Sequence, residues 1–350
     1  MKEFTITKQE AGQRFHKYLN RILPNAGSGF LYKMLRKKNI TLNGAKAEGG
    51  ETLSAGDVIN IFFSDETFAK MSGANAPEVV RFSARTLSEE QIVYEDEHLM
   101  AVFKPAGVLS QKDASGAEAI NEETLQYLLE RGDVSTESLR MYKPGICNRL
   151  DRNTAGILWV AKTLAGAQAM AEVLRNRNLE KYYFAFVTGV LTENSDVTLY
   201  LTKNEESNTV TLHETPAEGA SMIRTGIYPV ASNKRITLVR IRLYTGRSHQ
   251  IRSVMKHVGH PVLGDPKYSP TDADTVAFYR TRYHLHGQQL FAYAYRFPED
   301  LPEALSELCG ETITGLVPDA FAELLAGELP PAKEKEYGYL EIPGPSGLPV

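Results

Sequence analysis

The N-terminal part of the chain has apolar residues at helical spacing. Residues 12–23 carry them at positions i, i+4 and i+7, which predicts an amphipathic helix that ends at Pro24. Ser28 is a suitable N-cap for a second helix, and short strands are expected at 40–42 and 58–62. The inward positions of the two helices are Phe15, Leu19, Ile22, Leu31, Met34 and Leu35. The pattern predicts a small unit of two helices followed by strands.

From residue 91 onward, short apolar runs and strict alternation replace the helical spacing. They predict a hairpin and further strands at 92–103, 157–161, 179–189, 197–212, 220–244 and 284–295. Between residues 91 and 300, helices are expected at 123–131, 164–175 and 254–258. Many strands with a few helices packed on them favour an α+β fold. We expect a mixed, mostly antiparallel sheet with helices on its faces.

Loss of periodicity marks the expected domain boundaries. We assign residues 1–63 to a small domain, 64–90 to a polar linker, 91–300 to the main domain and 301–350 to an acidic C-terminal extension. Within that extension a last short helix is expected at 320–326.

Composition and charge narrow the class of protein. Hydrophobic residues make up 42% and charged residues 23%, as in ordinary soluble domains. We expect a cytoplasmic protein without a membrane span, because no apolar run approaches about 20 residues and no signal peptide is apparent. The two cysteines, Cys147 and Cys309, argue against disulfides or a cysteine metal site. The net charge of −4 hides a basic start, since residues 1–63 hold ten Lys/Arg and five Asp/Glu. That start suits a polyanionic partner.

A charged cluster precedes the predicted strand at 157–161. Asp151 lies between Arg149 and Arg152, and a Thr-Ala-Gly turn follows. Buried charge is costly unless it is paired, so the cluster is either a structural ion pair or part of an active site. The spacing alone favours neither.

Other kinds of catalytic site lack support in the sequence. There is no P-loop, no strand-borne Gly-x-Gly-x-x-Gly and no His-Glu-x-x-His motif, and no acidic or cysteine cluster accompanies the histidines. We therefore predict neither a metal nor an organic cofactor. An aspartate held by an arginine stays ionised and can act as a nucleophile. Arginines and a tyrosine around it suit a phosphate-bearing substrate with a base to stack.

The second predicted helix has a basic face. Lys33, Arg36 and Lys37 lie at positions i, i+3 and i+4, beside an Asn43-Gly44 turn. Such a face either binds phosphates or is simply solvated. The segment resembles the S4 RNA-binding domain in its Arg14-to-Leu19 helix, this basic helix and the strand and turn that follow. The resemblance implies that residues 1–63 bind structured RNA through its shape and backbone.

Five ordered motifs resemble those of the RluA-type pseudouridine synthases. They are Lys104-Pro105-Ala106-Gly107, Asn148-Arg149-Leu150-Asp151-Arg152-Asn153-Thr154-Ala155-Gly156, Lys181-Tyr182-Tyr183-Phe184-Ala185, Gly246-Arg247-Ser248-His249-Gln250-Ile251-Arg252 and Gly264-Asp265-x-x-Tyr268. With the S4-like domain, the resemblance covers residues 1 to about 300. It implies an RNA pseudouridine synthase that isomerises uridines, most often in large-subunit (23S-type) ribosomal RNA.

The resemblance also implies residue roles. Asp151 falls on the catalytic aspartate, Tyr183 on the tyrosine that stacks on the base, and Arg252 on the arginine that pairs with the aspartate. Arg149 matches the arginine that enters the space left by the flipped nucleotide. The other RNA-contacting positions are Leu150, Arg152, Arg247, His249 and Ile251, with Lys33, Arg36 and Lys37 in the N-terminal domain. His249 either contacts RNA or only braces its loop.

Two departures from the signature stand out. Asn148 replaces the usual histidine and Ala155 the usual serine. Because Asp151, Tyr183 and Arg252 are all present, we expect an active enzyme that acts as a monomer on structured RNA. The rival hypotheses are the same chemistry on transfer RNA and a non-catalytic RNA-binding or ribosome-assembly factor.

Overall fold

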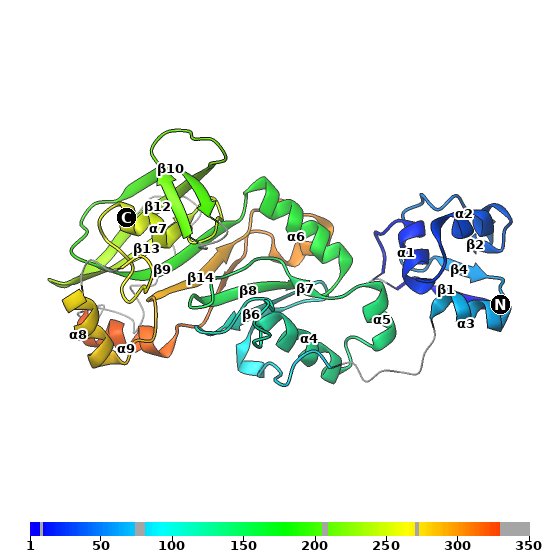
Figure 1. Cartoon of the computed structure of the whole chain (residues 1–350), viewed down its shortest axis with the longest axis horizontal. Helices are drawn as coiled ribbons and strands as arrows, with labels where there is room; N and C mark the ends of the chain where they lie inside the picture. The colour runs from blue at the N-terminus through cyan, green and yellow to red at the C-terminus, as the bar shows by residue number, and fades with distance from the viewer. Residues whose placement is uncertain (8–9, 74–80, 205–208, 270–272, 330–350) are drawn as a thin grey trace.

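The computed structural model describes residues 1–7, 10–73, 81–204, 209–269 and 273–329. A small N-terminal unit has its own sheet, in the order β1-β4-β2-β3 (Figure 1, blue). Its elements are β1 (Lys2–Thr5), α1 (Phe15–Ile22), α2 (Ser28–Arg36), β2 (Ile40–Leu42), β3 (Ala45–Lys46), β4 (Val58–Ile61) and α3 (Asp65–Ser72). The predicted inward positions Phe15, Leu19, Leu31 and Leu35 are all in its core.

Two details of this unit differ from expectation. Gly27 is the N-cap of α2 and Ser28 its first helical residue, so the capping role predicted for Ser28 is wrong. Helix α3 lies inside the segment expected to be a linker. The Ser64 hydroxyl caps α3 by accepting from Thr67 N at 3.2 Å, and Phe68 stacks on Phe4 with ring centroids 6.0 Å apart.

The main domain is built on one large sheet in the order β11-β10-β12-β13-β9-β14-β8-β6-β5, with β15 beside β14 and β7 beside β8. Its strands are β5 (Ile92–Glu95), β6 (Leu99–Lys104), β7 (Gly145–Ile146), β8 (Ala155–Ala161), β9 (Glu180–Thr188), β10 (Ser195–Asn204), β11 (Thr209–His213), β12 (Ser221–Ser232), β13 (Ile236–Leu243), β14 (Leu290–Arg296) and β15 (Thr312–Thr314). The helices are η1 (Glu89–Gln91), α4 (Ile120–Arg131), α5 (Thr136–Met141), α6 (Leu164–Asn176), α7 (Gln250–His257), α8 (Ala273–Tyr283), η2 (Glu303–Leu308) and α9 (Asp319–Glu328). The mixed, mostly antiparallel sheet with helices on its faces is as predicted.

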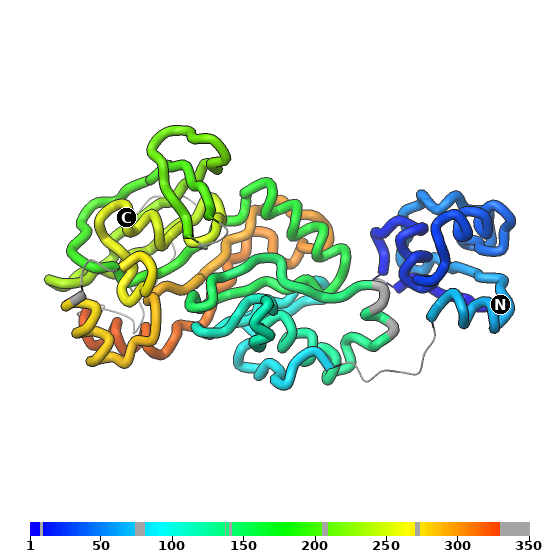
Figure 2. The backbone as a smooth tube through the Cα atoms, in the orientation of Figure 1, coloured from blue at the N-terminus to red at the C-terminus, as the bar shows by residue number. Residues whose placement is uncertain are grey.

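Strand β14 joins two halves of the sheet. It pairs antiparallel with β9 and parallel with β8, where Ala292 lies opposite Gly156. Figure 2 shows the green β8 and the orange β14 side by side in the middle of the domain. Gly156 is required at this contact, because its φ is 121° and an added Cβ would lie 2.2 Å from the Ala292 carbonyl oxygen.

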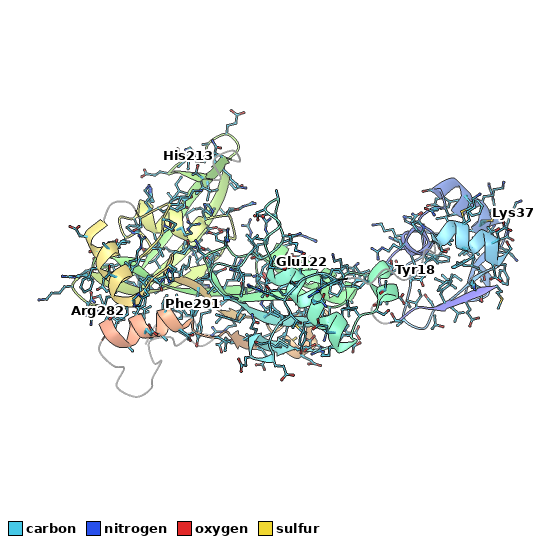
Figure 3. The ribbon with its side chains drawn as sticks, turned by 60° about the horizontal axis from the view of Figure 1, so that its bottom comes forward. Tyr18, Lys37, Glu122, His213, Arg282 and Phe291 are labelled. Carbon is cyan, nitrogen blue, oxygen red and sulfur yellow. The ribbon has the colours of Figure 1, made fainter. Side chains whose placement is uncertain are left out.

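Both faces of the sheet are covered at β9, so alternate residues enter different cores. Tyr183 and Ala185 join the core that contains Trp159. Phe184 and Phe186 join the core beneath α8 and α9, where Phe291 is labelled in Figure 3. Burial on both faces explains the unbroken apolar run of this strand.

The predicted start of the strand at residue 284 is wrong. Helix α8 ends at Tyr283, and the strand, β14, begins only at Leu290. His284 follows the helix in the left-handed region, with a φ of 50°, so the helix does not continue. In the C-terminal extension, the helix expected at 320–326 is present as α9, and its Phe321 packs on Phe186 with centroids 4.7 Å apart. Among the described residues, no helix is long and apolar enough to cross a membrane.

Candidate active site

The loop between β7 and β8 carries Asp151, and the last residue of β6 and the loop after β6 hold the backbone on either side of it. The Ser110 hydroxyl donates to Leu150 O at 2.8 Å and accepts from Leu150 N at 3.0 Å. The fully buried Lys104 donates from Nζ to Arg152 O at 2.9 Å, and also to Pro105 O and Val108 O at 3.0 and 2.8 Å. Burial lowers the pKa of Lys104 to about 7, against the opposing effect of the Asp151 charge. These hydrogen bonds fix the backbone of Leu150 and Arg152, the two neighbours of Asp151.

Arg252 connects two carboxylates. Its Nη1 donates to Asp151 Oδ2 at 2.7 Å, while Nε and Nη2 donate to Asp265 at 2.6 and 3.0 Å. The side chain of Asp265 is 0% exposed, Arg252 7% and Asp151 26%. Burial acts to lower the pKa of Arg252, but the hydrogen bonds and charges of both carboxylates outweigh it and raise that pKa. Asp265 therefore fixes the guanidinium that holds Asp151.

His249 begins helix α7 as its N-cap, in the left-handed region with a φ of 55°. Its Nδ1 lies 2.9 Å from the Tyr268 hydroxyl, and its Nε2 lies 3.8 Å from Asp151 Oδ2. Burial lowers the pKa of His249, against the opposing charge of Asp151. The Tyr268 ring also lies against Arg252, with Cζ 5.1 Å from the ring centroid. His249 and Tyr268 thus brace the ion pair from one side.

The loop before α7 is fixed by Gln250. Its Oε1 accepts from Arg247 N at 3.1 Å and from Thr245 Oγ1 at 3.0 Å, while its Nε2 donates to Arg224 O at 3.1 Å. The exposed Arg247 side chain is thereby carried at the rim of a pocket.

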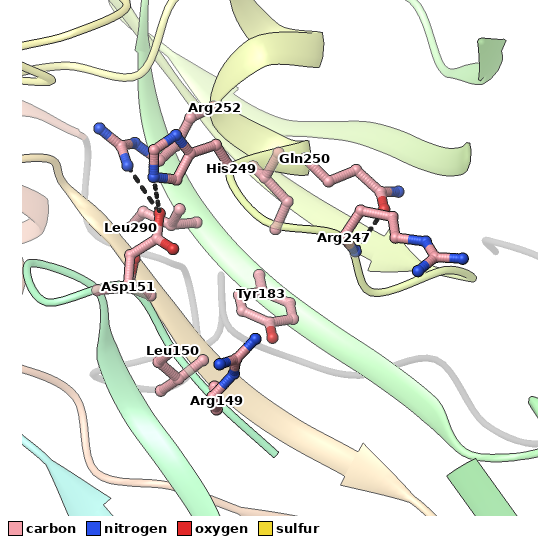
Figure 4. Close-up of a pocket in the computed structure, with 11 residues that line it drawn as sticks. Arg149, Leu150, Asp151, Tyr183, Arg247, His249, Gln250, Arg252 and Leu290 are labelled. Carbon is pink, nitrogen blue, oxygen red and sulfur yellow. Dashed lines mark hydrogen bonds and ion pairs between the residues drawn. The ribbon is translucent and has the colours of Figure 1, made fainter. Parts of the chain in front are cut away.

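Tyr183 forms the wall of this pocket opposite the ion pair. It projects from β9, which lies next to β13 and β14, and only 7% of it is exposed. Burial raises the pKa of Tyr183 to about 12, so the phenol is neutral near neutral pH. Figure 4 shows its ring to the right of Asp151 and above Arg149, with its hydroxyl on the Arg149 side.

One pocket contains most of the predicted site residues. Its lining consists of Arg149, Leu150, Asp151, Thr154, Tyr183, Arg247, His249, Gln250, Ile251, Arg252 and Leu290 (Figure 4). Arg152 is outside this lining: it is exposed, and its Nε donates to Gly107 O at 2.9 Å. Lys33, Arg36 and Lys37 are exposed in the N-terminal unit, where Figure 3 labels Lys37.

The sequence interpretation missed the roles of Asp265 and Lys104 in holding the site. Both lie in the ordered motifs Gly264-Asp265-x-x-Tyr268 and Lys104-Pro105-Ala106-Gly107, which was the available signal. In the part of the chain that the structure describes, no group of three His, Cys, Asp or Glu side chains could hold a metal ion.

Comparison with known proteins identifies the class. A family model described as RNA pseudouridylate synthase matches residues 98–257, which include Asp151, Tyr183 and Arg252. The ribosomal large subunit pseudouridine synthase C of Vibrio cholerae serotype O1 is 30% identical over 293 residues, covering 81% of this chain and 86% of that protein. The protein of the same name from Pasteurella multocida is 30% identical over 294 residues, with 82% and 84% covered. The chain therefore belongs to the RNA pseudouridine synthase family, within its RluA-type branch, as the motifs predicted.

A solved structure supports the fold. Human RNA Pseudouridylate Synthase Domain Containing 1 aligns with a TM-score of 0.50 and 22% identity, over 70% of this chain and 91% of that one. The chain is thus an RNA pseudouridine synthase in fold and in sequence.

Proposed function

We propose that this enzyme converts specific uridines of large-subunit ribosomal RNA to pseudouridine, with Asp151 as the catalytic residue. The observation that carries the proposal is the ion pair of Asp151 and Arg252, facing Tyr183 across one pocket. The curated relatives from Vibrio cholerae and Pasteurella multocida are named for the large ribosomal subunit, which supports this choice of RNA.

The geometry suits attack by an ionised carboxylate. Oδ2 of Asp151 accepts from Arg252 Nη1, and the other oxygen is turned toward the Tyr183 side of the pocket (Figure 4). In the reaction the bond from N1 of uracil to C1′ of the ribose breaks, and a bond from C5 to C1′ forms. The base loses the proton on C5 and gains one on N1, so no external reactant is consumed. Arg252 keeps the carboxylate oriented throughout, through its hydrogen bond to Oδ2.

Access to C1′ and C5 requires a nucleotide outside the helix. Extruding it costs a few kcal/mol, which protein contacts must offset. The Tyr183 ring offers a stacking surface for the extruded base. Arg149 and Arg247 are exposed beside it and suit phosphate contacts. Arg149 is proposed to occupy the vacated position in the RNA.

The test is conversion of uridine in cognate RNA. Pseudouridines are mapped in total RNA from cells with and without the protein, and in ribosomal RNA transcripts treated with purified enzyme. Asp151→Asn keeps the side-chain volume and should abolish conversion, whereas Asp196→Asn, at an exposed position of β10 outside the pocket, should retain it. Conversion in transfer RNA alone would contradict the proposed substrate. Full activity of Asp151→Asn would contradict the proposed mechanism.

We also propose that the N-terminal unit binds RNA through the exposed face of α2. Replacing Lys33, Arg36 and Lys37 together by glutamine removes three exposed cations without touching the core. Each phosphate contact contributes a slope of about 0.7–0.9 in log affinity against log salt, so the slope should fall by roughly 2. Gel-shift titrations at several salt concentrations measure it. An unchanged slope would refute RNA contact by this face.

A further inference from the structure

The side of the sheet that faces away from the pocket carries arginines and tyrosines at its surface. In register, Tyr228 of β12 lies opposite Arg240 of β13, and Arg240 lies opposite Phe184 of β9. Paired residues of neighbouring strands share a face, so these side chains lie on the Phe184 side and not on the Tyr183 side. Beyond the core under α8 and α9, this side has a group of partly or fully exposed residues that we call the arginine–tyrosine face: Arg224, Tyr228, Arg240, Arg242 and Tyr244.

Guanidinium groups and tyrosine rings of this face stack on one another. Arg224 Cζ lies 4.2 Å and Arg242 Cζ 4.7 Å from the ring centroid of Tyr244. Arg240 Cζ lies 5.3 Å from the ring centroid of Tyr228. Stacking of this kind holds a long side chain in place and leaves the N–H groups in the guanidinium plane to donate to an anion. Single-stranded RNA stacks its bases on layers of this composition.

Gly226 lets the Tyr228 ring lie down on the sheet. The two residues are two positions apart on β12, so they share a face. A Cβ at Gly226 would lie 2.7 Å from the Tyr228 hydroxyl oxygen and 3.0 Å from its Cε2, so the ring occupies space that another side chain would need. Tyr228 is partly exposed. It therefore offers a flat ring at the surface of the sheet.

The charge of this side of the sheet is opposite to that of the whole chain. In the described parts of β9, β10, β12, β13 and β14, four arginines and two carboxylates point this way, which leaves +2 against −4 for the chain. The arginines are Arg224, Arg240, Arg242 and Arg296, and the carboxylates are Glu180 and Asp196. An excess of arginine fits an anionic partner, and the rings favour one with planar bases.

The arginine–tyrosine face reaches the rim of the pocket through the loop between β13 and α7. Tyr244 follows the last residue of β13, and Arg247 of the pocket lining is three residues further on. The backbone N–H of Arg224 donates to Thr245 Oγ1 at 2.9 Å, and its carbonyl oxygen accepts from Gln250 Nε2 at 3.1 Å, which ties the loop to β12. The middle of the loop is exposed, and Figure 4 shows the Arg247 side chain on the side away from the ion pair. A strand that leaves the pocket there can pass directly onto the face.

We propose that the arginine–tyrosine face binds single-stranded RNA, namely the stretch of the substrate that leaves the pocket past Arg247. The proposal rests on the proposed function, because the pocket fixes where this stretch begins. Bases stack on the layers of Tyr228 and Tyr244, and the phosphates between them contact Arg240 and Arg242. The RNA is thus held on two sides of one sheet, and a flanking strand adds affinity that a shorter substrate lacks.

A cycle that combines RNA length with Tyr228→Ala tests the contact. Ribosomal RNA fragments with single-stranded flanks are trimmed separately from the 5′ and the 3′ end, and each is titrated with full-length enzyme carrying Asp151→Asn. Trimming one of the two ends should weaken binding at least about fivefold, the effect of one lost stack, and Tyr228→Ala should weaken binding of the untrimmed fragment as much. On the trimmed fragment Tyr228→Ala should change the affinity less than about twofold. Equal effects of Tyr228→Ala on both fragments, or no effect of trimming in its absence, would overturn the proposal.

The salt dependence tests the arginines. Arg240→Gln and Arg242→Gln together remove two cations, and Glu180 keeps Arg296 as a partner at 3.5 Å, so no carboxylate is left alone. With the untrimmed fragment, the slope of log affinity against log salt should fall by about 1.4, at about 0.7 for each phosphate of a single strand. An unchanged slope would refute the phosphate contacts.

Two control variants separate stacking from a general loss of structure. Tyr228→Phe keeps the ring and should bind the untrimmed fragment within about twofold of wild type. Tyr127→Ala on α4 removes a partly exposed tyrosine that also has an arginine over its ring, with Arg131 Cζ 5.0 Å from the centroid, and should bind as wild type does. Urea unfolding followed by Trp159 fluorescence shows that each variant is folded.

Crosslinking distinguishes failure of this proposal from failure of the proposed function. Polyuridylate that contains 4-thiouridine is irradiated on the full-length enzyme, and the crosslinked peptides are identified by mass spectrometry. Peptides with Tyr228 or Tyr244 should carry the RNA, whether or not uridine is converted. If the enzyme forms no pseudouridine, the proposed function fails while such crosslinks still support the face. An enzyme that forms pseudouridine but gives no crosslink at either tyrosine would overturn the role of the face alone.

Discussion

Asp265→Asn is the substitution that best tests how the site is held together. Oδ1 of Asp265 accepts the backbone N–H groups of Lys267 and Tyr268 at 2.9 and 3.0 Å. In the variant the amide oxygen must stay with these donors. The NH2 group then faces Arg252 Nε, which lies 2.6 Å from Oδ2 in the native protein. A buried charge pair is replaced by two opposed donors.

The expected loss of stability follows from burial. Removing one partner of a buried ion pair costs about 3–5 kcal/mol, because the other charge stays buried without full compensation. Asp151 still contacts Arg252 at 2.7 Å, so we expect the lower end, about 3 kcal/mol. In a domain of this size, that lowers the melting temperature by about 6–12 °C. Catalysis should also fall, since Arg252 loses the contact that orients it toward Asp151.

Urea unfolding followed by circular dichroism measures the effect. The matched control is Asp196→Asn, which breaks a bidentate pair with Arg224 whose side chains are 37% and 49% exposed. That pair is solvated, so its loss should leave the unfolding curve unchanged. Full-length protein is used throughout, and the main-domain transition is followed by the fluorescence of its single tryptophan, Trp159.

The effect of Asp265→Asn on stability should change sign when Arg252 is removed. In an Arg252→Met background, Asp265 becomes a buried carboxylate without its cation, so Asp265→Asn should be neutral or stabilising there. The reasoning is refuted if Asp265→Asn costs no more than Asp196→Asn, or if it costs the same with and without Arg252.

Three further predictions concern other parts of the site. Gly156→Ala should lower the free energy of unfolding by several kcal/mol, because the new Cβ would lie 2.2 Å from the Ala292 carbonyl oxygen. Gly27→Ala is the control, because it has open space around it and should not lose several kcal/mol. Thermal melting of the two variants compares them. Lys104→Met should cost about 3 kcal/mol in urea unfolding, since three backbone carbonyls lose their donor. The pKa of His249 is lowered by burial in the folded state, so the unfolded chain takes up the proton first as pH falls below about 6.5, and stability is lost in that window. His249→Gln should therefore lose less stability than wild type between about pH 7.5 and pH 5.5, and an equal loss would contradict the assignment.

The sequence was informative where chemistry is local. The charged cluster around Asp151 was visible from residue types, but its spacing left a structural ion pair and an active site equally open. The structure shows that Asp151 pairs with Arg252 and that Arg152 contacts Gly107 instead. The choice between the two arginines came from the ordered motifs, because no pattern of hydrophobicity connects positions a hundred residues apart.

The rest could not be predicted for a physical reason. Simple alternation along β14 would place Phe291, Tyr293 and Tyr295 on one face of the sheet. A bulge between Ala292 and Ala294 instead turns Tyr295 into the other core. A bulge is decided by packing against β9, which is a tertiary effect. The pairing of Asp265 with Arg252 depends in the same way on how a loop after α7 folds back, and not on local spacing.

The central place of β14 has a consequence for the timing of activity. Chains emerge from the ribosome N-terminus first, so β8 and β9 are made long before Leu290–Arg296. Until β14 is inserted, the strand after Asp151 and the strand bearing Tyr183 have no strand to join them. We therefore expect the nascent chain to be inactive until β14 pairs with both β8 and β9, because only then are Asp151 and Tyr183 held in one sheet. An enzyme whose proposed substrate belongs to the ribosome thus gains its complete site only after residues 290–296 have joined the sheet.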